Sequence, residues 1–220
     1  MNKKVCVSYS LGKDSTLALY RTIKSGKDVV ALIISVDEKN LRSWFHGVDT
    51  LLIDAVSKSL NIPVILAKGD GNNYREVFIE AIESAKQLGA MECIFGDIDI
   101  EDHYKWCNSV CIDAGVESCF PLWQESRRDI VEEFIDNGFK AIIKTVSKQY
   151  DLNEKFLNQV LTHELVNEFE KLGIDVCGEN GEYHTFVCDG PIFSEPIDVK
   201  SAGTFESDYS FSTILELSNE

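Results

Sequence analysis

Two segments of this sequence carry the residue types that chemistry on an anionic substrate requires. The first is the run from Ser8 to Ser15, in which serine hydroxyls flank Gly12 and Lys13. The run joins an apolar strand pattern at 4–8 to a helical pattern at about 14–25. The beginning of a helix offers backbone N–H groups and the positive end of a dipole to an anion, so this run predicts a phosphate-binding turn.

The spacing of this turn differs from that of a Walker loop. Val7, rather than glycine, stands five residues before Gly12, and Asp14 follows the lysine. An ordinary strand-to-helix turn, capped by Asp14 or Ser15, is the alternative. Phosphate binding is favoured over it because a Gly-Lys pair stands at this point of the pattern.

The second segment runs from Cys177 to Phe193 and has the sequence CGENGEYHTFVCDGPIF. It places Glu179, Glu182 and His184 on backbone broken by glycine. Such groups can hold Mg²⁺, position ammonia or act as a base. A hairpin turn whose glutamates face solvent is the alternative, and the residues alone favour that alternative.

Two histidines stand near other polar groups. His46 follows a strand end, from which it could reach a nucleotide or substrate, and a hydrogen-bonded structural histidine explains it equally well. His103 lies close in sequence to four acidic residues, and such a cluster suggests a metal site. No ligand spacing repeats there, so a solvated acidic loop is the favoured interpretation. The acidic residues are Asp97, Asp99, Glu101 and Asp102.

Three cysteines lie close together along the chain. Cys107 and Cys111 share a helix face at a spacing of four, and Cys119 follows. A metal or sulfur-carrier site is one interpretation, but buried packing is favoured.

Repeated β–α units must position these segments. Short apolar runs alternate with helical periodicity over the first two thirds of the chain, which predicts right-handed crossovers and a doubly wound parallel sheet of the α/β class. Such sheets bind ligands at the carboxyl ends of their strands. The expected strands are 4–8, 29–36, 62–66, 91–95, about 119–122 and 139–146; the expected helices are about 14–25, one marked by Val48, Leu51, Leu52 and Ala55, one marked by Val77, Phe78, Ala81, Ile82 and Ala85, and 102–114 and 126–137.

The pattern changes after residue 146. One long helix is expected there, followed by strands at 182–188 and within 192–217. We therefore expect a nucleotide-binding domain at 1–146 and a small α+β extension at 147–220, on the ligand edge of the sheet. The apolar residues that predict the long helix are Phe156, Leu157, Val160, Leu161, Val166 and Phe169.

The composition excludes several classes of protein. With 37 acidic and 21 basic residues the formal charge is −16, which disfavours extended binding to nucleic acid. The chain has no apolar stretch of about 18 residues, so no membrane span is expected, and the apolar run after Met1–Lys4 is too short for a signal peptide. Seven cysteines, an odd number, suit the reduced thiols of a cytoplasmic protein, and no tightly bound zinc is expected.

The first segment resembles a known signature. Ser10–Ser15 is similar to the S-G-G-K-D-S motif of the ATP pyrophosphatases, which bind ATP and cleave it to AMP and pyrophosphate. The last four residues match. Leu11 stands where that family usually has glycine, and its Cβ is expected beside the phosphates.

The second segment resembles the G-E-G-G-E-(Y/F)-x-T-F-V…P-(L/F)-F motif of the diphthine–ammonia ligase family. Asn180 stands where glycine is usual, and asparagine tolerates positive φ better than most residues. His184 stands where glutamate is usual. The resemblance covers nearly the whole chain and includes Ser43-Trp44-Phe45-His46, Gly96-Asp97-Ile98, Pro121-Leu122-Trp123 and Gly138–Ile143.

The resemblance implies a PP-loop enzyme that activates a carboxylate as an acyl-adenylate for attack by ammonia, with ATP and Mg²⁺ as cofactors. The carboxylate would be diphthine of elongation factor 2 where the source makes diphthamide, and another acid otherwise. Catalytic roles are implied for Lys13, Glu179, Glu182 and His184, and a magnesium role for Asp14. ATP binding is implied for Ser8, Ser10, Leu11, Gly12, Lys13, Asp14, Ser15, Ile34, Val36, His46, Gly96 and Asp97, with adenine near Ile34–Val36.

Two other functions share the first loop. A tRNA sulfurtransferase would want a basic surface and C-x-x-C cysteines, and both the charge and the Cys107-x-x-x-Cys111 spacing argue against it. A module that binds ATP or AMP without turnover is favoured only by Leu11. The sequence does not name the acyl acceptor, and it leaves a homodimer open.

Overall fold

The computed structural model describes residues 2–44, 46–150 and 152–218. Their contacts divide the chain into two compact units. Unit 1 comprises Met1–Ser10 and Asp14–Glu125, and unit 2 comprises Leu11–Lys13 and Ser126–Glu220. Phe45, which belongs to one of the quoted motifs, lies outside the described residues.

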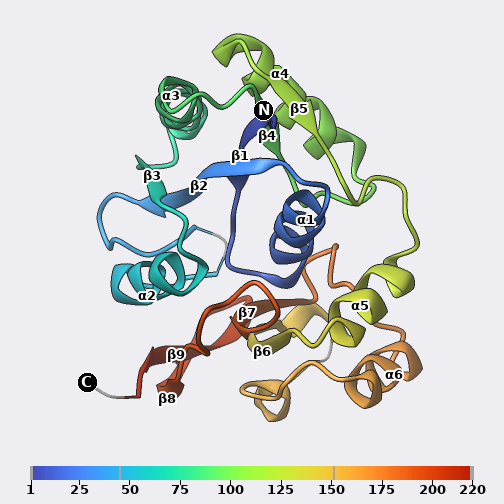
Figure 1. Cartoon of the computed structure of the whole chain (residues 1–220). Coiled ribbons are helices and arrows are strands. Elements are labelled where there is room, and N and C mark those ends of the chain that lie inside the picture. The colour runs from blue at the N-terminus through green and yellow to red at the C-terminus, as the bar shows by residue number, and fades with distance from the viewer. Residues whose placement is uncertain (1, 45, 151, 219–220) are drawn as a thin grey trace. The chain divides into compact units, whose positions relative to one another are not determined.

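Unit 1 contains a five-stranded parallel sheet. Its strands are β1 (Lys4–Ser8), β2 (Asp28–Asp37), β3 (Val64–Gly69), β4 (Glu92–Ile94) and β5 (Glu117–Cys119). They are arranged in the order β3-β2-β1-β4-β5, and every neighbouring pair is parallel (Figure 1). The predicted α/β class and the predicted parallel sheet are confirmed.

Helices cover both faces of this sheet. Figure 1 shows α3 (Tyr74–Gln87) and α4 (Glu101–Ala114) on one face, and α1 (Lys13–Lys24) and α2 (Thr50–Leu60) on the other. The start of α2 is capped by Asp49, whose side chain accepts a hydrogen bond from Leu52 N. Leu51, expected on the buried face of α2, is exposed, because the helix turns Leu52, Ile53 and Val56 inward. Among the described helices none is long and apolar enough to cross a membrane.

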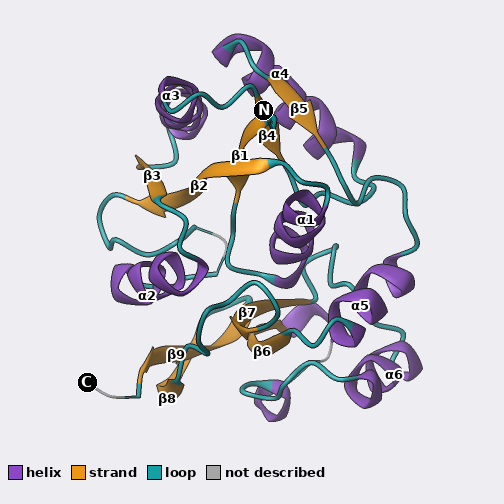
Figure 2. Cartoon of the chain, in the orientation of Figure 1, coloured by secondary structure: helices purple, strands orange, loops and turns teal. Residues whose placement is uncertain are grey.

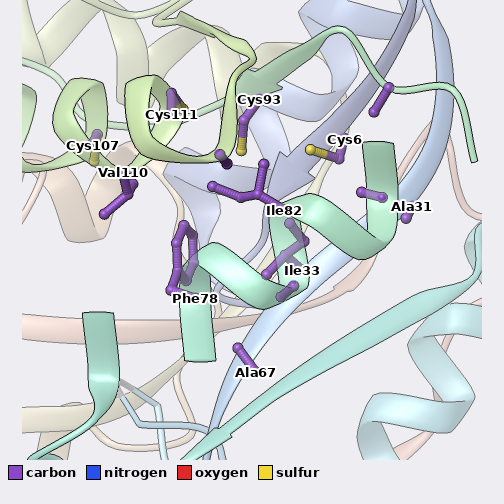
Figure 3. Close-up of a cluster of buried hydrophobic side chains, with 14 of the residues drawn as sticks. Cys6, Ala31, Ile33, Ala67, Phe78, Ile82, Cys93, Cys107, Val110 and Cys111 are labelled. Carbon is purple, nitrogen blue, oxygen red and sulfur yellow. The ribbon is translucent and has the colours of Figure 1, made fainter. Parts of the chain in front are cut away.

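The face beneath α3 and α4 holds the largest set of buried cysteines. Cys6, Cys93, Cys107 and Cys111 lie among apolar side chains that include Phe78 (Figure 3). Burial raises the pKa of the Cys107 thiol, and the neighbouring carboxylate of Asp97 raises it further. Packing, rather than a surface thiol chemistry, is therefore the confirmed role of the Cys107–Cys111 pair.

Unit 2 contains a four-stranded antiparallel sheet. Its strands are β6 (Lys140–Ser147), β7 (Tyr183–Asp189), β8 (Val199–Glu206) and β9 (Ser210–Leu217), in the order β7-β6-β9-β8. The helices of unit 2 are α5 (Arg127–Asp136) and α6 (His163–Lys171), and the connection between β7 and β8 is a loop (Figure 2).

The boundary between the units differs from the expected one. The strand expected at 139–146 was assigned to the parallel sheet, but β6 pairs with β7 and β9. Because backbone pairing commits a strand to one sheet, β6 and the preceding α5 belong to unit 2. The contacts separate the units after Glu125 rather than after residue 146.

The single long helix expected after residue 146 is wrong. The chain instead forms short 3₁₀ turns at Lys148–Tyr150 and Glu154–Phe156 and then α6. Asn158 adopts a left-handed conformation with φ 64°, and Val160 bridges to Ile142 of β6. Thr162 then caps α6 through its hydroxyl, so the apolar spacing spans several elements that share one core.

Candidate functional site

The strand order places the loop after β1 at the topological switch point of the parallel sheet. β2 and β3 lie on one side of β1, and β4 and β5 lie on the other, so the direction of the chain across the sheet reverses between β1 and β4. Parallel sheets bind ligands at the carboxyl ends of the strands where such a reversal occurs. The connections that leave this point begin after Ser8 and after Ile94.

Hydroxyl groups tie the chain before the turn to the first residues of α1. Ser15 Oγ accepts a hydrogen bond from Ser10 N at 3.2 Å and lies 3.0 Å from Ser10 Oγ. The buried hydroxyls of Tyr9 and Thr16 are 3.0 Å apart. Burial raises the pKa of the Tyr9 phenol, so this pair stays neutral. These hydrogen bonds fix the predicted turn at the start of α1, so that the backbone N–H groups there keep one direction.

Gly96 packs directly against this helix start. A Cβ added to Gly96 would stand 2.8 Å from Ser15 N and 2.9 Å from the carbonyl carbon of Asp14. Both are backbone atoms, so no side-chain movement could make room, and only glycine allows this approach. Asp97 follows Gly96, which brings the backbone that carries the Asp97 carboxylate close to the backbone of Asp14.

The side chain of Asp97 has two partners on α4. Its Oδ1 lies 3.4 Å from His103 Nδ1, and its Oδ2 accepts a weak hydrogen bond from Cys107 Sγ at 3.8 Å. Asp99, Glu101 and Asp102 are exposed. Within the described part of the chain no three His, Cys, Asp or Glu side chains are grouped closely enough to hold a metal ion. These three carboxylates are solvated as expected, but the expected loop is wrong for Glu101 and Asp102, which lie in the first turn of α4.

A small cavity lies at the carboxyl ends of β1 and β2. Its volume is ≈ 30 Å³, which is room for about one water molecule. Three of the residues expected to bind nucleotide line it, namely Ser8, Ser10 and Ile34, whereas Val36 and His46 are buried without lining it. The remaining lining residues are Tyr9, Ile33, Ser35, Ser43 and Tyr74.

Lys13 connects the first segment to the second within unit 2. Its backbone N–H donates to Thr185 Oγ1 at 3.1 Å, and its ammonium group donates to the carbonyl oxygen of Cys177. The same ammonium group lies 5.4 Å from the centre of the Tyr183 ring. Two segments that are more than 160 residues apart along the chain therefore meet at one buried lysine.

The loop before β7 is built around Asp175. Its carboxylate accepts hydrogen bonds from Cys177 N at 3.2 Å and Glu179 N at 2.9 Å, and it forms an ion pair with Arg127 at 2.5 Å. Gly178 has φ 70°, and a Cβ there would stand 2.9 Å from Tyr183 O. The loop is thus a specific folded structure, which contradicts the alternative of a plain solvent-facing hairpin turn.

Glu182 is buried and bound by its own loop. Its two carboxylate oxygens accept hydrogen bonds from Asn180 N and Asn180 Nδ2, each at 3.0 Å. Asn180 is not among the described residues with positive φ, so its backbone makes no use of the tolerance that asparagine has for that region. Its side chain instead holds the glutamate. Glu179 is half-buried.

His184 lies on β7, opposite an irregularity in β6. Thr185 pairs with Ile143 and His184 pairs with Thr145, so Lys144 is an extra residue, a β-bulge. Lys144 is buried and donates to Thr213 O at 3.1 Å. Burial, Lys13 and Lys144 together lower the pKa of the His184 imidazole to about 4. The ring is therefore neutral at pH 7.

Leu11 occupies the position where the resembled signature usually has glycine. Its φ is 72°, in the left-handed region that glycine adopts without penalty. Its carbonyl oxygen accepts a hydrogen bond from Val187 N at 2.9 Å, and its side chain is fully buried. Leu11 therefore adopts a conformation that glycine favours, and its apolar side chain packs in the interior.

Several residues of the site were not among those predicted to act. Thr185 and Cys177 bind Lys13, and both lie inside the second motif, where the motif itself was a usable signal. Lys144 had no such signal, because in sequence it is one lysine at the end of an apolar run. Tyr74 lines the small cavity and stacks near Trp106, with ring centres 5.4 Å apart, from a helix that was predicted without a functional role.

The parallel sheet with its glycine–lysine turn at the point of reversal defines a doubly wound α/β protein with a second, antiparallel unit. The sequence matches the family model of the diphthamide synthase N-terminal domain over residues 3–118 and that of the diphthamide synthase C-terminal domain over residues 126–216. The chain belongs to the diphthamide synthase family.

Individual relatives agree with this membership. A protein named diphthine–ammonia ligase from Homo sapiens is 27% identical over 226 residues, and one from Mus musculus is 25% identical over 224 residues. Each match covers 90% of this chain and 84% of the relative. These findings confirm the resemblance and the expectation of a ligase, an enzyme that forms carbon–nitrogen bonds.

A solved structure is also similar in outline. It is described as a predicted subunit of a tRNA methyltransferase from Methanocaldococcus jannaschii, and the match covers 89% of this chain and 100% of that one. The TM-score is 0.44 at 15% identity, so this likeness contributes nothing to the assignment of function or site.

Proposed function

We propose that this protein is an ATP-dependent ligase that activates a carboxylate as an acyl-adenylate and transfers the acyl group to ammonia, with release of AMP and pyrophosphate. The carboxylate of diphthine, on which the curated relatives act according to their names, is the group proposed to be activated where the source makes diphthamide. ATP and ammonia are the other substrates, and the proposed location is the cytoplasm.

One observation carries this proposal. Lys13 of the phosphate-binding signature is hydrogen-bonded to Thr185 and Cys177 of the second signature. A ligase of this kind must hold a nucleotide phosphate and the carboxylate substrate in one place, since bringing reactants together supplies much of the rate. Contact between the two signatures through a buried lysine supports a shared site.

The phosphate groups of ATP are proposed to bind the residues Ser10–Ser15. Backbone N–H groups at the start of α1 and the charge of Lys13 suit the phosphates, and the carboxyl ends of β1 and β2 suit the nucleoside. The small cavity beside Tyr74 lies at this edge, on the nucleoside side, next to Ile34. Since it has room for about one water, adenine binding requires the side chains around it to move.

Asp14 and Asp97 are the residues that would hold Mg²⁺. The backbone of Gly96, which precedes Asp97, packs against the backbone of Asp14 and Ser15, and Mg²⁺ in nucleotide enzymes commonly uses one or two carboxylates together with phosphate oxygens. The ion would supply positive charge to the phosphates. Lys13 would stabilise the charge that develops on the departing pyrophosphate.

The residues of the second segment are proposed to handle the carboxylate substrate and ammonia. The carboxylate oxygen of this substrate attacks the α-phosphorus of ATP, and the bond from phosphorus to pyrophosphate breaks. Ammonia then attacks the acyl carbon, AMP leaves, and a proton must be removed from nitrogen. Neutral His184 and the carboxylates of Glu179 and Glu182 are the groups proposed to orient ammonia and accept that proton.

The variant Lys13→Ala tests the nucleotide assignment. We expect loss of ATP affinity or of ammonia-dependent pyrophosphate release, while the far-ultraviolet circular dichroism spectrum stays that of the wild type. Lys140→Ala is the control, because Lys140 is an exposed lysine of the same unit, paired with Asp189 at 2.8 Å. Unchanged ATP affinity and turnover in Lys13→Ala would contradict the proposed site.

A further inference from the structure

A cavity that the proposed function does not use lies at the amino ends of the strands of unit 1. Its volume is ≈ 650 Å³, within the range of about 300–1,000 Å³ that is usual for binding sites. Residues that lead into the strands line it, since Lys3 precedes β1, Met91 precedes β4 and Glu117 begins β5. Because the strands are parallel, this edge of the sheet is opposite to the edge where the first loop lies. The other lining residues are Lys86, Gly89, Ala90, Gly115 and Val116.

Large apolar side chains are exposed around this cavity. The exposed fraction is 48% for Leu88, 54% for Met91 and 66% for Ile112. Leu88 directly precedes the lining residue Gly89, and the carbonyl oxygen of Ile112 accepts a hydrogen bond from the lining residue Gly115 at 3.1 Å. Exposed apolar side chains gathered at one place are typical of interaction surfaces, and methionine is enriched in them. We call Leu88, Met91, Ile112 and the lining of the cavity the amino-edge face.

The local sequence explains why these side chains are exposed. Helix α4 ends at Gly115, which has φ 68°, and the chain enters β5 two residues later. Helix α3 is followed by Gly89, which has φ 100°, and the chain enters β4 three residues later. Glycine in this conformation ends a helix abruptly. Both connections are therefore too short to fold over the apolar residues at the ends of the two helices.

The charges near the cavity are of both signs. Lys3 is balanced by its ion pair with Glu117. Lys4 and Lys86 instead donate to main-chain carbonyl oxygens, at 3.4 Å and 2.9 Å, and form no ion pair with a carboxylate of the described residues. Glu83, three residues before Lys86 on α3, likewise has no cationic partner in the described part of the chain. A formal charge of −16 makes two copies of the protein repel each other, so a face that offers cations as well as anions is the one suited to their contact.

We propose that the amino-edge face is the contact between two copies of the chain related by a two-fold axis. A two-fold axis brings the same surface of both copies together, so that surface must complement itself. Here the exposed apolar side chains of each copy meet the cavity of the other, and the unpaired lysines of each copy meet glutamates of the other. A partner of a single charge would use only half of these groups. The contact leaves the carboxyl edge of the sheet open to a large substrate, so this inference does not depend on the proposed function.

Sedimentation velocity over a range of protein concentrations tests the contact. We expect the wild type to form a dimer, and Ile112→Glu and Ile112→Lys each to raise its dissociation constant at least about 10-fold. The two variants change the net charge in opposite directions, so a loss in both reports the lost apolar contact rather than the overall repulsion. Leu51→Glu is the matched control, because Leu51 is an exposed leucine of α2, 54% exposed, on the other face of the same sheet. Its dimer should dissociate as the wild type does.

Methionine labelling locates the contact on the chain. The sequence has two methionines, Met1 and Met91, so protein labelled with [methyl-¹³C]methionine gives a simple NMR spectrum, in which Met91→Leu assigns the Met91 signal. We expect this signal to move on dilution in step with the dissociation seen by sedimentation. In Ile112→Glu it should stand at the position of the dilute wild type at every concentration. The affinity of this variant for ATP should equal that of the wild type.

Several outcomes would overturn the inference. A wild type that is monomeric at every concentration, a dimer that is as stable in both Ile112 variants as in the wild type, or a dimer that dissociates without movement of the Met91 signal would each exclude this contact. A Met91 signal that is constant on dilution and moves only when the diphthine-containing protein is added would assign the face to that substrate instead. None of these results bears on the proposed function, whose failure is the absence of ATP binding or of ammonia-dependent pyrophosphate release.

Discussion

The left-handed conformation of Leu11 leads to a prediction that separates backbone strain from burial. Its φ of 72° costs a residue with a Cβ about 1–2 kcal/mol relative to glycine. Its side chain is fully buried, so truncation to alanine loses about 2–5 kcal/mol. Truncation to glycine removes one more methyl group, which costs about 0.8 kcal/mol of stability compared with alanine. The greater chain entropy of glycine in the unfolded state costs about 0.5–1 kcal/mol more.

These contributions predict nearly equal stability for Leu11→Ala and Leu11→Gly. The extra losses of the glycine variant, about 1.3–1.8 kcal/mol in total, are offset by the relief of strain, about 1–2 kcal/mol. Leu17 is the matched control, since it is equally buried but lies within α1, where no such strain exists. There, glycine should be less stable than alanine by about 1.5–2 kcal/mol.

Urea denaturation followed by far-ultraviolet circular dichroism measures the four free energies of unfolding. Each comparison is made between alanine and glycine at one position, so the different packing of the two leucines does not enter. We expect a gap below about 0.5 kcal/mol at position 11 and about 1.5–2 kcal/mol at position 17. A gap at position 11 as large as that at position 17 would refute the argument that Leu11 is strained.

Three further predictions concern the site. Gly96→Ala should weaken ATP binding at least about 10-fold, because the added Cβ meets the backbone of Ser15 and displaces the start of α1. Gly69→Ala is the control and should affect ATP binding less, because its Cβ meets only side chains. Isothermal titration with ATP compares the two variants. Glu182→Gln should keep ATP affinity within a few-fold but lose most amide formation, measured as ammonia-dependent product. Equal losses of ATP affinity and of amide formation would argue against a role for Glu182 in the reaction with ammonia. The unfolded chain takes up a proton on His184 near pH 6.5 and the folded protein only near pH 4, so the wild type should lose stability as the pH falls through this window. His184→Asn should lose less between pH 7 and pH 4.5 in parallel denaturation experiments, and an identical loss in both proteins would contradict the lowered pKa.

The amino-acid sequence by itself determined the parallel half of the fold and the edge of the sheet at which the first loop lies. The strand at 4–8 agrees with β1, the expected helix at 102–114 differs from α4 by one residue at its start, and the expected helix at 126–137 differs from α5 by one residue at each end. These elements have strong local signals, because apolar periodicity and turn residues act over a few residues at a time. The loop at Ser10–Ser15 could be found for the same reason, as could the second motif.

Only the tertiary structure decided which sheet receives each strand and which side chains surround His184. The run at 140–147 has the same apolar pattern whether it joins parallel or antiparallel neighbours, so its assignment depended on pairing with β7 and β9. The apolar residues between 156 and 169 mimic one helix because several short elements face one core. The position of Lys144 in a bulge beside His184 could not be predicted from the sequence for a similar reason. A bulge is a mismatch between two strands, and neither strand shows it alone.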